Sequence, residues 1–144
     1  MFDSSANLHV PVAEPLVVDN PDQYHWDQDV DVCVVGLGAA GGSAAIEAAS
    51  CGARVLVLDR LNGGGASRMS GGVVYLGGGT HTQREVDVED SPDNMFEYLR
   101  VQVGGVVSDA TLRRFCENSV TNHEWLESLG VRFLSRFYRE KTSF

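Results

Sequence analysis

The most constraining feature of this chain is a glycine motif that lies between a short β-branched run and an alanine-rich segment. The motif, Gly-Leu-Gly-Ala-Ala-Gly, occupies residues 36–41. Residues 30–35 before it are rich in valine, and their second half is nearly continuously apolar. This pattern predicts a buried parallel strand. Residues 39–51 contain six alanines and predict a helix that ends at Gly52. Residues 54–59 predict a second strand, so the three elements together predict one right-handed βαβ unit.

The three glycines of this motif have distinct physical roles in a Rossmann-like α/β fold. A G-x-G-x-x-G motif that follows a strand and opens a helix is the context in which such a fold binds a dinucleotide. Gly36 permits the tight turn, Gly38 lets a pyrophosphate approach the backbone, and Gly41 lets the helix pack against the strand. The amides of the first helical turn then point at the phosphates, aided by the helix dipole.

An acidic residue follows at the spacing that the motif requires. Asp59 ends the second predicted strand and is separated from Gly41 by the seventeen residues 42–58. A carboxylate at this place can accept both ribose hydroxyls of an adenosine, and it would repel a 2′-phosphate, so NADP is disfavoured. A solvated strand end is the alternative interpretation of Asp59.

A second glycine-rich segment distinguishes this chain from an NAD dehydrogenase, which would continue into another helix and strand. Eight of the 16 glycines lie within residues 62–79. The glycine motif, the strand with its acid, and the run Asn-Gly-Gly-Gly-Ala-Ser-Arg-Met-Ser-Gly-Gly at 62–72 together resemble the FAD-binding domain of the fumarate reductase and succinate dehydrogenase flavoprotein superfamily. Residues 70–80 are most similar to the 3-ketosteroid dehydrogenase branch of that superfamily, the 3-oxosteroid Δ4- and Δ1-dehydrogenases.

The resemblance implies FAD as the cofactor, bound by two backbone cradles because one helix terminus cannot hold so long a molecule. It implies that the Ala40 amide meets a phosphate and that Arg60 lies near the adenosine. Residues 65–67 are then expected at the diphosphate and ribityl chain, and residues 70–72 at the isoalloxazine. Ordinary turn hydroxyls are the alternative for the two serines. The implied FAD-binding residues are Gly36, Gly38, Ala39, Ala40, Gly41, Asp59, Arg60, Gly65, Ala66, Ser67, Ser70, Gly71 and Gly72.

The steroid branch implies a dehydrogenase or reductase that acts on a CH–CH bond of a small molecule, a 3-oxosteroid or a related cyclic ketone. The flavin carries the hydride chemistry, and the protein binds and tunes it. Three alternatives stay open: a fumarate- or succinate-type flavoprotein acting on dicarboxylates, an NAD dehydrogenase, and a catalytically inactive FAD-binding fragment. The family's catalytic residues lie beyond the matched stretch, so the sequence identifies neither catalytic residues nor an electron acceptor.

The resemblance covers residues 29–144, whereas the family's flavoproteins are several hundred residues long. We therefore expect an incomplete FAD-binding domain, truncated after its N-terminal part. Residues 1–28 before it predict an extended, proline-rich lead-in with a weak strand at 16–18. Because a two- or three-stranded parallel sheet leaves an apolar face uncovered, we expect the isolated chain to be unstable or to bind FAD weakly.

Two helices and two short strands are predicted after the second glycine segment. The first helix begins at Ser91-Pro92, and a second, longer one begins at Ser108 and ends at Gly130. Short strands are predicted at 73–76 and 131–134. The expected buried stripes are Met95, Phe96, Leu99 and Val103 on the first helix, and Leu112, Phe115, Cys116, Ser119, His123 and Leu126 on the second.

Composition excludes other classes of protein. Eleven Lys and Arg face 20 Asp and Glu, so the net charge of −9 argues against a nucleic-acid partner. The three cysteines are few, widely spaced and set among apolar residues, which predicts reduced, buried thiols rather than disulfides or a metal site. No secretory signal and no membrane-spanning run are recognised, so we expect a cytoplasmic location.

Several residues with chemical potential are interpreted as structural. Tyr75 is expected to pack, His81 to be solvated in a polar loop, and His123 to be a satisfied interior histidine. The acids of residues 85–90 predict a solvated loop, and no metal site is expected.

Overall fold

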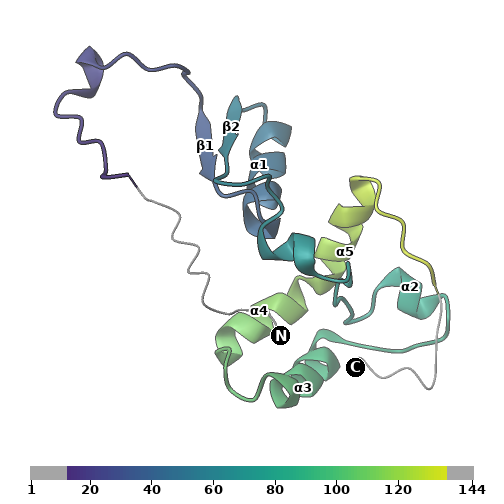
Figure 1. The fold of residues 1–144 in the computed structure, drawn as a ribbon. Helices are drawn as coiled ribbons and strands as arrows, with labels where there is room; N and C mark the ends of the chain where they lie inside the picture. The colour runs from purple at the N-terminus through teal and green to yellow at the C-terminus, as the bar shows by residue number, and fades with distance from the viewer. Residues whose placement is uncertain (1–12, 136–144) are drawn as a thin grey trace, which may run out of the picture. The chain divides into compact units, whose positions relative to one another are not determined.

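The chain divides into two units, Met1–Ser70 and Gly71–Phe144 (Figure 1). The structure, a computed structural model, describes residues 13–135. The first unit contains a parallel sheet and the second is helical. Within residues 13–135 no helix is long and apolar enough to cross a membrane.

The predicted βαβ unit is confirmed in the first unit. It consists of β1 (Val32–Val35), α1 (Ala39–Ser50) and β2 (Val55–Leu58). The two strands pair in parallel, in a register that joins Val32 to Val55 and Val35 to Leu58. The helix ends as expected at Gly52, which has φ of +85°. The Gly52 N–H donates to the Ala49 carbonyl at 2.9 Å and so caps the last turn.

Helix α1 covers one face of this small sheet. Val32 and Val34 are half-buried, and a Cβ built on Gly41 of α1 would lie 3.3 Å from Val34 Cγ1, so these valines face the helix. Cys33 and Val35 point the other way, and Val35 is 84% exposed. Within residues 13–70 no element covers this other, apolar face of the sheet, in line with the argument from an open parallel sheet.

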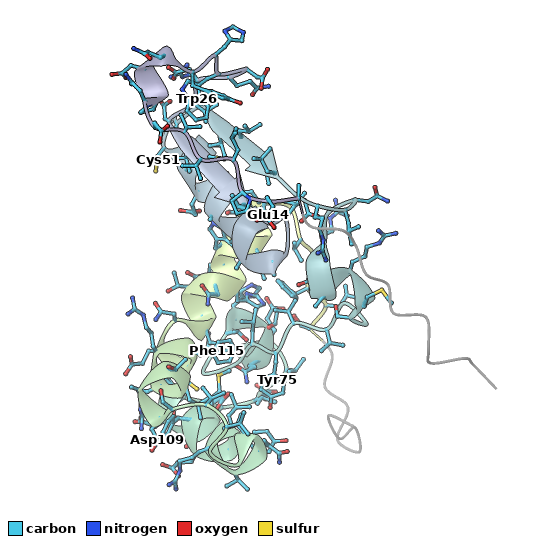
Figure 2. All side chains as sticks on the ribbon, turned by 60° about the vertical axis from the view of Figure 1, so that its left-hand side comes forward. Glu14, Trp26, Cys51, Tyr75, Asp109 and Phe115 are labelled. Carbon is cyan, nitrogen blue, oxygen red and sulfur yellow. The ribbon has the colours of Figure 1, made fainter. Side chains whose placement is uncertain are left out.

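The expectation of buried cysteines is wrong for two of the three. Cys33 lies in β1 and is exposed. Cys51 is the C-cap of α1 (labelled in Figure 2) and is also exposed. Cys116 is buried, and this burial raises the pKa of its thiol. Apolar neighbours in the sequence predicted burial of Cys33, but the structure describes no element that covers that side of the strand.

The lead-in contains a single 3₁₀ turn, η1 (Pro21–Gln23), in its described part. Asn20 caps this turn by accepting the Asp22 N–H at 3.1 Å. The weak strand expected at 16–18 is wrong, since those residues pair with no strand among residues 13–135. Leu16 is 71% exposed and Val17 79%, so little of their apolar surface is buried to favour an extended edge.

The second unit is built from four helices within its described residues. They are α2 (His81–Arg84), α3 (Pro92–Val103), α4 (Asp109–Glu117) and α5 (Ser119–Ser128). The predicted starts are confirmed, because Ser91 Oγ accepts the Asn94 N–H at 3.1 Å and Ser108 Oγ accepts the Thr111 N–H at 3.2 Å. The core between α3 and α4 consists of Met95, Phe96, Leu112 and Cys116, with Leu99, Val103 and Val107 packed against it.

Three elements of the second unit differ from the prediction. The expected single helix is broken at Asn118, whose side-chain amide donates to the Arg114 carbonyl at 2.7 Å and so ends α4. Residues 73–76 and 131–134 are not strands. A strand needs a neighbour to satisfy its backbone groups, and no segment among residues 13–135 pairs with either run. The buried stripe itself is largely confirmed, with Phe115 as the exception at 38% exposed.

Candidate functional site

The turn from β1 into α1 is as tight as the glycine motif predicts. The Gly36 N–H donates to the Leu58 carbonyl of the neighbouring strand at 2.7 Å, and Gly36 has φ of +99°. A Cβ added to Gly41 would overlap the Gly36 carbonyl oxygen and press on Val34. A side chain at position 41 would therefore force the helix away from the strand, which is the expected role of the third glycine.

The N-terminus of α1 combines backbone donors outside its helical hydrogen-bond series with open space beside two glycines. The first bond of its i to i−4 series runs from the Gly42 N–H to the Gly38 carbonyl at 2.8 Å, so the amides of Ala39, Ala40 and Gly41 precede that series. A Cβ built on Gly36 or Gly38 meets no atom within 4 Å. Donors and space together suit an anionic group such as a pyrophosphate.

The Asp59 carboxylate ties the end of β2 to the glycine turn. Its Oδ2 accepts the Leu37 N–H at 2.7 Å and its Oδ1 accepts the Leu61 N–H at 2.8 Å. These bonds, the one from Leu37 above all, hold the pKa of Asp59 below its ordinary value. Each oxygen retains a second lone pair, so an ionised Asp59 still has acceptor capacity for ribose hydroxyls.

The second glycine segment packs directly on the first turn. The Gly64 N–H donates to the Leu37 carbonyl at 2.5 Å. A Cβ built on Gly65 would lie 3.1 Å from Gly38 Cα, and one built on Gly63 would lie 2.7 Å from Leu37 Cδ2. Side chains at these positions would push the two segments apart, so the glycines here allow two backbone stretches to form one continuous surface.

A hollow of about 560 Å³ opens beside this surface, at the carboxyl ends of β1 and β2. Parallel α/β sheets bind ligands at this edge. The structure thus brings four of the expected site residues, Gly36, Asp59, Arg60 and Gly65, to one cavity. The lining residues are Val35, Gly36, Leu58, Asp59, Arg60, Leu61 and Gly65.

The remaining expected site residues lie further along the chain. Ala66 and Ser67 belong to a 3₁₀ turn, η2 (Gly65–Met69), and are exposed. The Ser70 hydroxyl donates to the Ser67 carbonyl at 2.8 Å, which is a turn contact. Gly71 and Gly72 belong to the second unit. Their place beneath a flavin stays a prediction.

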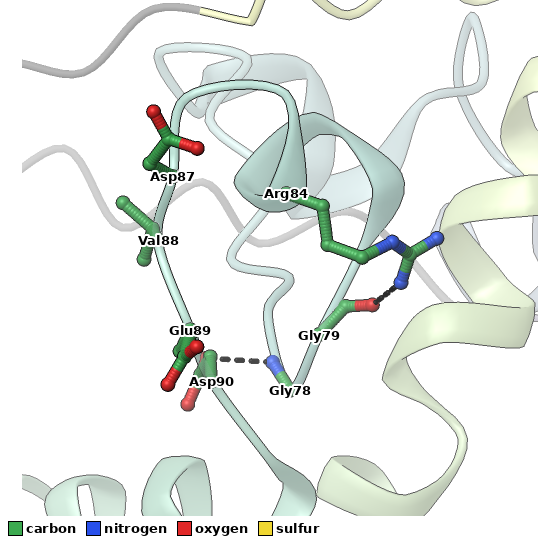
Figure 3. A pocket seen from close by; sticks show the side chains of 7 residues that line it. All are labelled: Gly78, Gly79, Arg84, Asp87, Val88, Glu89 and Asp90. Atoms are coloured by element: carbon green, nitrogen blue, oxygen red, sulfur yellow. Dashed lines mark hydrogen bonds between the residues drawn. The ribbon is translucent and has the colours of Figure 1, made fainter.

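A hollow of about 690 Å³ in the second unit is lined by the acidic segment (Figure 3). Asp90 Oδ2 accepts the Gly78 N–H at 2.7 Å and the Gln83 side-chain amide at 2.8 Å, and Arg84 donates to the Gly79 carbonyl. The expectation of a merely solvated loop is therefore wrong for Asp90, which holds the glycines in place. The acidic residues that line this hollow do not suit a phosphate.

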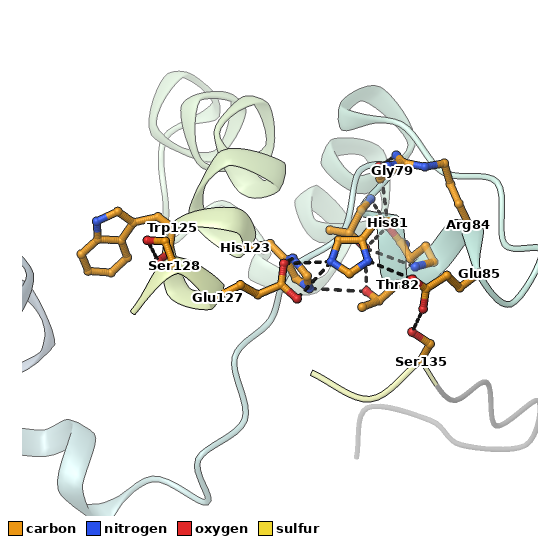
Figure 4. A network of polar contacts seen from close by, with 12 residues as sticks. Gly79, His81, Thr82, Arg84, Glu85, His123, Trp125, Glu127, Ser128 and Ser135 are labelled. Atoms are coloured by element: carbon orange, nitrogen blue, oxygen red, sulfur yellow. Dashed lines mark hydrogen bonds and ion pairs between the residues drawn. The ribbon is translucent and has the colours of Figure 1, made fainter. Parts of the chain in front are cut away.

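Two histidines that sequence reasoning set aside meet at one carboxylate (Figure 4). His81 Nε2 lies 2.8 Å from Glu127 Oε2 and His81 Nδ1 lies 3.3 Å from Glu85 Oε1. Hydrogen bonding to these carboxylates raises the pKa of His81, and Glu127 contributes more than Glu85. The expectation of a solvated His81 is wrong, because its ring is held between two carboxylates. The contact with Glu127 was not foreseen, because that residue lies 46 positions away in the sequence.

His123 is buried as predicted, with 3% of its surface exposed. Its Nδ1 nevertheless has no hydrogen-bond partner among residues 13–135, so the description "satisfied" is wrong for that nitrogen. The i, i+4 spacing of His123 and Glu127 was the available signal that the two side chains share a helix face.

A parallel βαβ unit with a glycine turn and an acid at the end of its second strand defines a dinucleotide-binding protein. The chain belongs to the FAD binding domain family, whose model matches residues 31–142. The cofactor of this family is FAD, as the resemblance to the flavoprotein superfamily implied.

Curated relatives include steroid enzymes and reductases. The chain is 50% identical to a 3-oxo-5-alpha-steroid 4-dehydrogenase from Comamonas testosteroni over 98% of its own length and 27% of that protein. It is 32% identical to a 3-oxosteroid 1-dehydrogenase from Mycolicibacterium smegmatis, over 81% of this chain and 22% of that protein. The chain therefore spans about a quarter of the length of these relatives.

The solved structures that this chain resembles also include a steroid dehydrogenase and a reductase. A 3-ketosteroid-delta4-(5alpha)-dehydrogenase from Rhodococcus jostii, in complex with 4-androstene-3,17-dione, superposes with a TM-score of 0.72 at 43% identity, covering 79% of this chain and 24% of that one. A flavocytochrome c3 fumarate reductase in its open conformation superposes with a TM-score of 0.65 at 32% identity, covering 72% of this chain and 18% of that one.

Proposed function

We propose that residues 29–144 are the N-terminal part of the FAD-binding domain of a dehydrogenase that acts on a CH–CH bond of a 3-oxosteroid or a related cyclic ketone. The observation that carries the FAD site is the hollow at the strand ends, where Gly36, Asp59 and Gly65 meet. The 50% identity to a steroid 4-dehydrogenase supports the substrate class.

The residues present fit the adenosine and pyrophosphate parts of FAD. The space beside Gly38 and the amides of Ala39, Ala40 and Gly41 suit the pyrophosphate. The ionised Asp59 suits the ribose hydroxyls, and Arg60 lies beside it on the wall of the hollow. Ala66, Ser67, Ser70, Gly71 and Gly72 are proposed to continue along the ribityl chain toward the isoalloxazine.

The chain's own residues bind and orient the cofactor. When bound, the flavin supplies the redox chemistry that removes two hydrogens from the substrate. The proposed role of Asp59 is to fix the adenosine end while also holding the glycine turn in shape. The groups that move the substrate's proton are proposed to lie in the part of the protein beyond this chain, as is the contact with the electron acceptor. For the protein itself we propose a cytoplasmic location.

A dicarboxylate reductase is the second candidate. The chain is 33% identical to a fumarate reductase (cytochrome) from Shewanella frigidimarina over 71% of this chain, and the fumarate reductase structure shares its fold. Such an enzyme needs cationic side chains that clamp two carboxylates, whereas a steroid site is apolar with a few hydrogen-bond donors.

Turnover by the whole protein that contains this chain distinguishes the candidates. The purified holoprotein is mixed with a 3-oxosteroid and an artificial electron acceptor, and separately with fumarate and a reduced dye. Reduction of the acceptor by the steroid alone supports the proposal. Fumarate reduction without steroid oxidation supports the second candidate, and neither reaction despite bound flavin supports an FAD-binding protein without this activity.

The FAD site is tested on the 144-residue chain by calorimetry with FAD. We expect weak binding, because one sheet face is uncovered and the chain spans only part of its relatives. Stoichiometric, tight flavin binding with cooperative unfolding would contradict the expected instability of the chain, and absence of any heat would contradict the site itself.

A further inference from the structure

Three potential metal ligands converge within the second unit, in a network that the FAD site does not use (Figure 4). His81 begins α2, and His123 and Glu127 lie one turn apart on α5. Their ligand atoms all lie within 4.8 Å of one another. Glu127 Oε2 is 2.8 Å from His81 Nε2 and 3.3 Å from His123 Nδ1. Tetrahedral zinc, with bonds of about 2.0–2.1 Å, spaces its ligand atoms by about 3.4 Å, so small side-chain shifts would suffice.

The buried nitrogen of His123 points into this cluster without a hydrogen bond. The side chain of His123 is only 4% exposed. Its Nδ1 lies near Glu127 but has no hydrogen-bond partner in the described part of the chain. The Phe133 ring stacks on the imidazole, with 4.3 Å between ring centroids, and so restricts its rotation. A buried polar atom that makes no hydrogen bond is costly, and a bound cation would satisfy it.

The outer nitrogens of both imidazoles have hydrogen-bond partners, a carboxylate for His81 and a hydroxyl, which can accept, for His123. His81 Nδ1 lies 3.3 Å from Glu85 Oε1, and His123 Nε2 lies 3.4 Å from Thr82 Oγ1. Ser135 in turn donates to the other oxygen of Glu85. A neutral imidazole that donates its outer N–H to such an acceptor has a lone pair on its inner nitrogen, and for His81 this requires that the ion displace the proton that the neighbouring carboxylates favour. This is the arrangement that fixes the tautomer of metal-binding histidines.

We propose that His81 Nε2, His123 Nδ1 and a carboxylate oxygen of Glu127 bind a divalent transition-metal ion, with Zn²⁺ as the best match. Two imidazoles and one carboxylate are ligands that zinc accepts, and a water molecule completes four-coordination. The side chains of His81 and Glu127 are 39% and 30% exposed, so the ion can enter from solvent. The ion would join α2 to α5 and stabilise the second unit, independently of flavin.

The experiment is a zinc titration of the 144-residue chain against a chromophoric chelator at pH 8, without flavin. The exposed Cys33 and Cys51 are replaced by serine throughout, because free thiols bind zinc. We expect one zinc ion per chain. His81→Gln and Glu127→Gln should each abolish this binding. Glu85→Ala, which removes the acceptor for His81 Nδ1, should weaken it by about 10–100-fold.

Two matched variants serve as controls. His25→Gln removes an exposed histidine of the first unit, and Glu124→Gln removes an exposed carboxylate of α5; both should leave zinc affinity unchanged. Far-UV circular dichroism checks the helix content of every variant. In addition, ¹⁵N-histidine spectra of the chain with intact ligands should show metal shifts at two histidines, one through Nε2 and one through Nδ1. This readout needs no ligand variant.

Absence of zinc binding, or binding that survives both His81→Gln and Glu127→Gln, would overturn the proposal. Histidine spectra that do not change with zinc would also overturn it, and the cluster would then be a hydrogen-bonded His–Glu–His network without metal.

Discussion

The Asp59 carboxylate accepts the backbone N–H of Leu37 at 2.7 Å, across 22 residues of sequence. This bond joins the end of β2 to the middle of the glycine turn. The acid that is proposed to bind a ribose therefore also shapes the turn that is proposed to receive the pyrophosphate. The ribose-binding role proposed for Asp59 and its observed hydrogen bond to the turn depend on the same charge.

We predict that Asp59→Asn weakens FAD binding by about tenfold, because an amide offers one acceptor oxygen where the turn and the ribose use two. The variant should also melt at a lower temperature, since Leu37 and Leu61 both donate to this carboxylate. Calorimetry with FAD and thermal denaturation measure the two effects. Asp22→Asn in the lead-in is the control, and equal behaviour of both variants would contradict the role of Asp59.

Substitutions at two glycines of one motif should separate packing from binding. Gly41→Ala is expected to destabilise the first unit by about 1–3 kcal/mol, because the new methyl group overlaps the Gly36 carbonyl. Gly38→Ala meets no atom within 4 Å, so it should leave stability nearly unchanged and weaken FAD binding by crowding the pyrophosphate. Urea denaturation and FAD titration of both variants provide the comparison. Equal losses of stability in the two variants would refute this separation of packing from binding.

The stability of the first unit should fall in acid. The Arg54 side chain, and then its backbone N–H, hold the pKa of Asp31 below its ordinary value, and backbone N–H groups do the same for Asp59. A lowered carboxyl pKa adds stability that is complete above the unfolded-state pKa, near 3.8, and is lost as the pH falls through the folded-state value. Melting temperatures measured from pH 6 down to pH 2 should therefore decline below about pH 4. Asp31→Asn should make this decline shallower. A melting temperature that rises as the pH falls would contradict the predicted loss of stability in acid.

Ser119 is a buried polar residue whose loss should be costly. Its hydroxyl oxygen accepts the Gly77 N–H at 2.9 Å, and the residue is 0% exposed. Ser119→Ala leaves that buried donor unsatisfied, which should reduce the free energy of unfolding by about 1–3 kcal/mol. The exposed Thr121→Ala on the same helix is the control. Chemical denaturation measures both, and a stability loss no larger than that of the control would argue against the bond.

The cysteines should divide into two classes of reactivity. Cys33 and Cys51 are exposed, whereas Cys116 is buried and burial raises the pKa of its thiol. A thiol reagent under native conditions should therefore label two cysteines quickly and the third only after denaturation. Mass spectrometry of the labelled chain locates them. Rapid labelling of Cys116 would show that the core between α3 and α4 opens readily.

Part of the structure followed from local sequence signals. The strand, helix and strand of the βαβ unit were predicted because β-branched runs, clustered alanines and capping glycines act within a few residues. The serine caps of α3 and α4 were predicted for the same reason. By contrast, residues 73–76 have the composition of a strand but join no sheet within residues 13–135. Asn118 ends α4 through a side-chain bond that periodicity does not reveal.

The sequence by itself determined the class of site, because the glycine spacing and Asp59 express constraints that backbone geometry places on phosphate and ribose binding. Only the tertiary structure decided which distant groups meet. It placed Gly65 against Gly38, and it brought His81 from α2 to Glu127 on α5. Contacts of this kind depend on how helices pack and loops close. Packing is a property of the folded chain as a whole, and no short stretch of sequence encodes it.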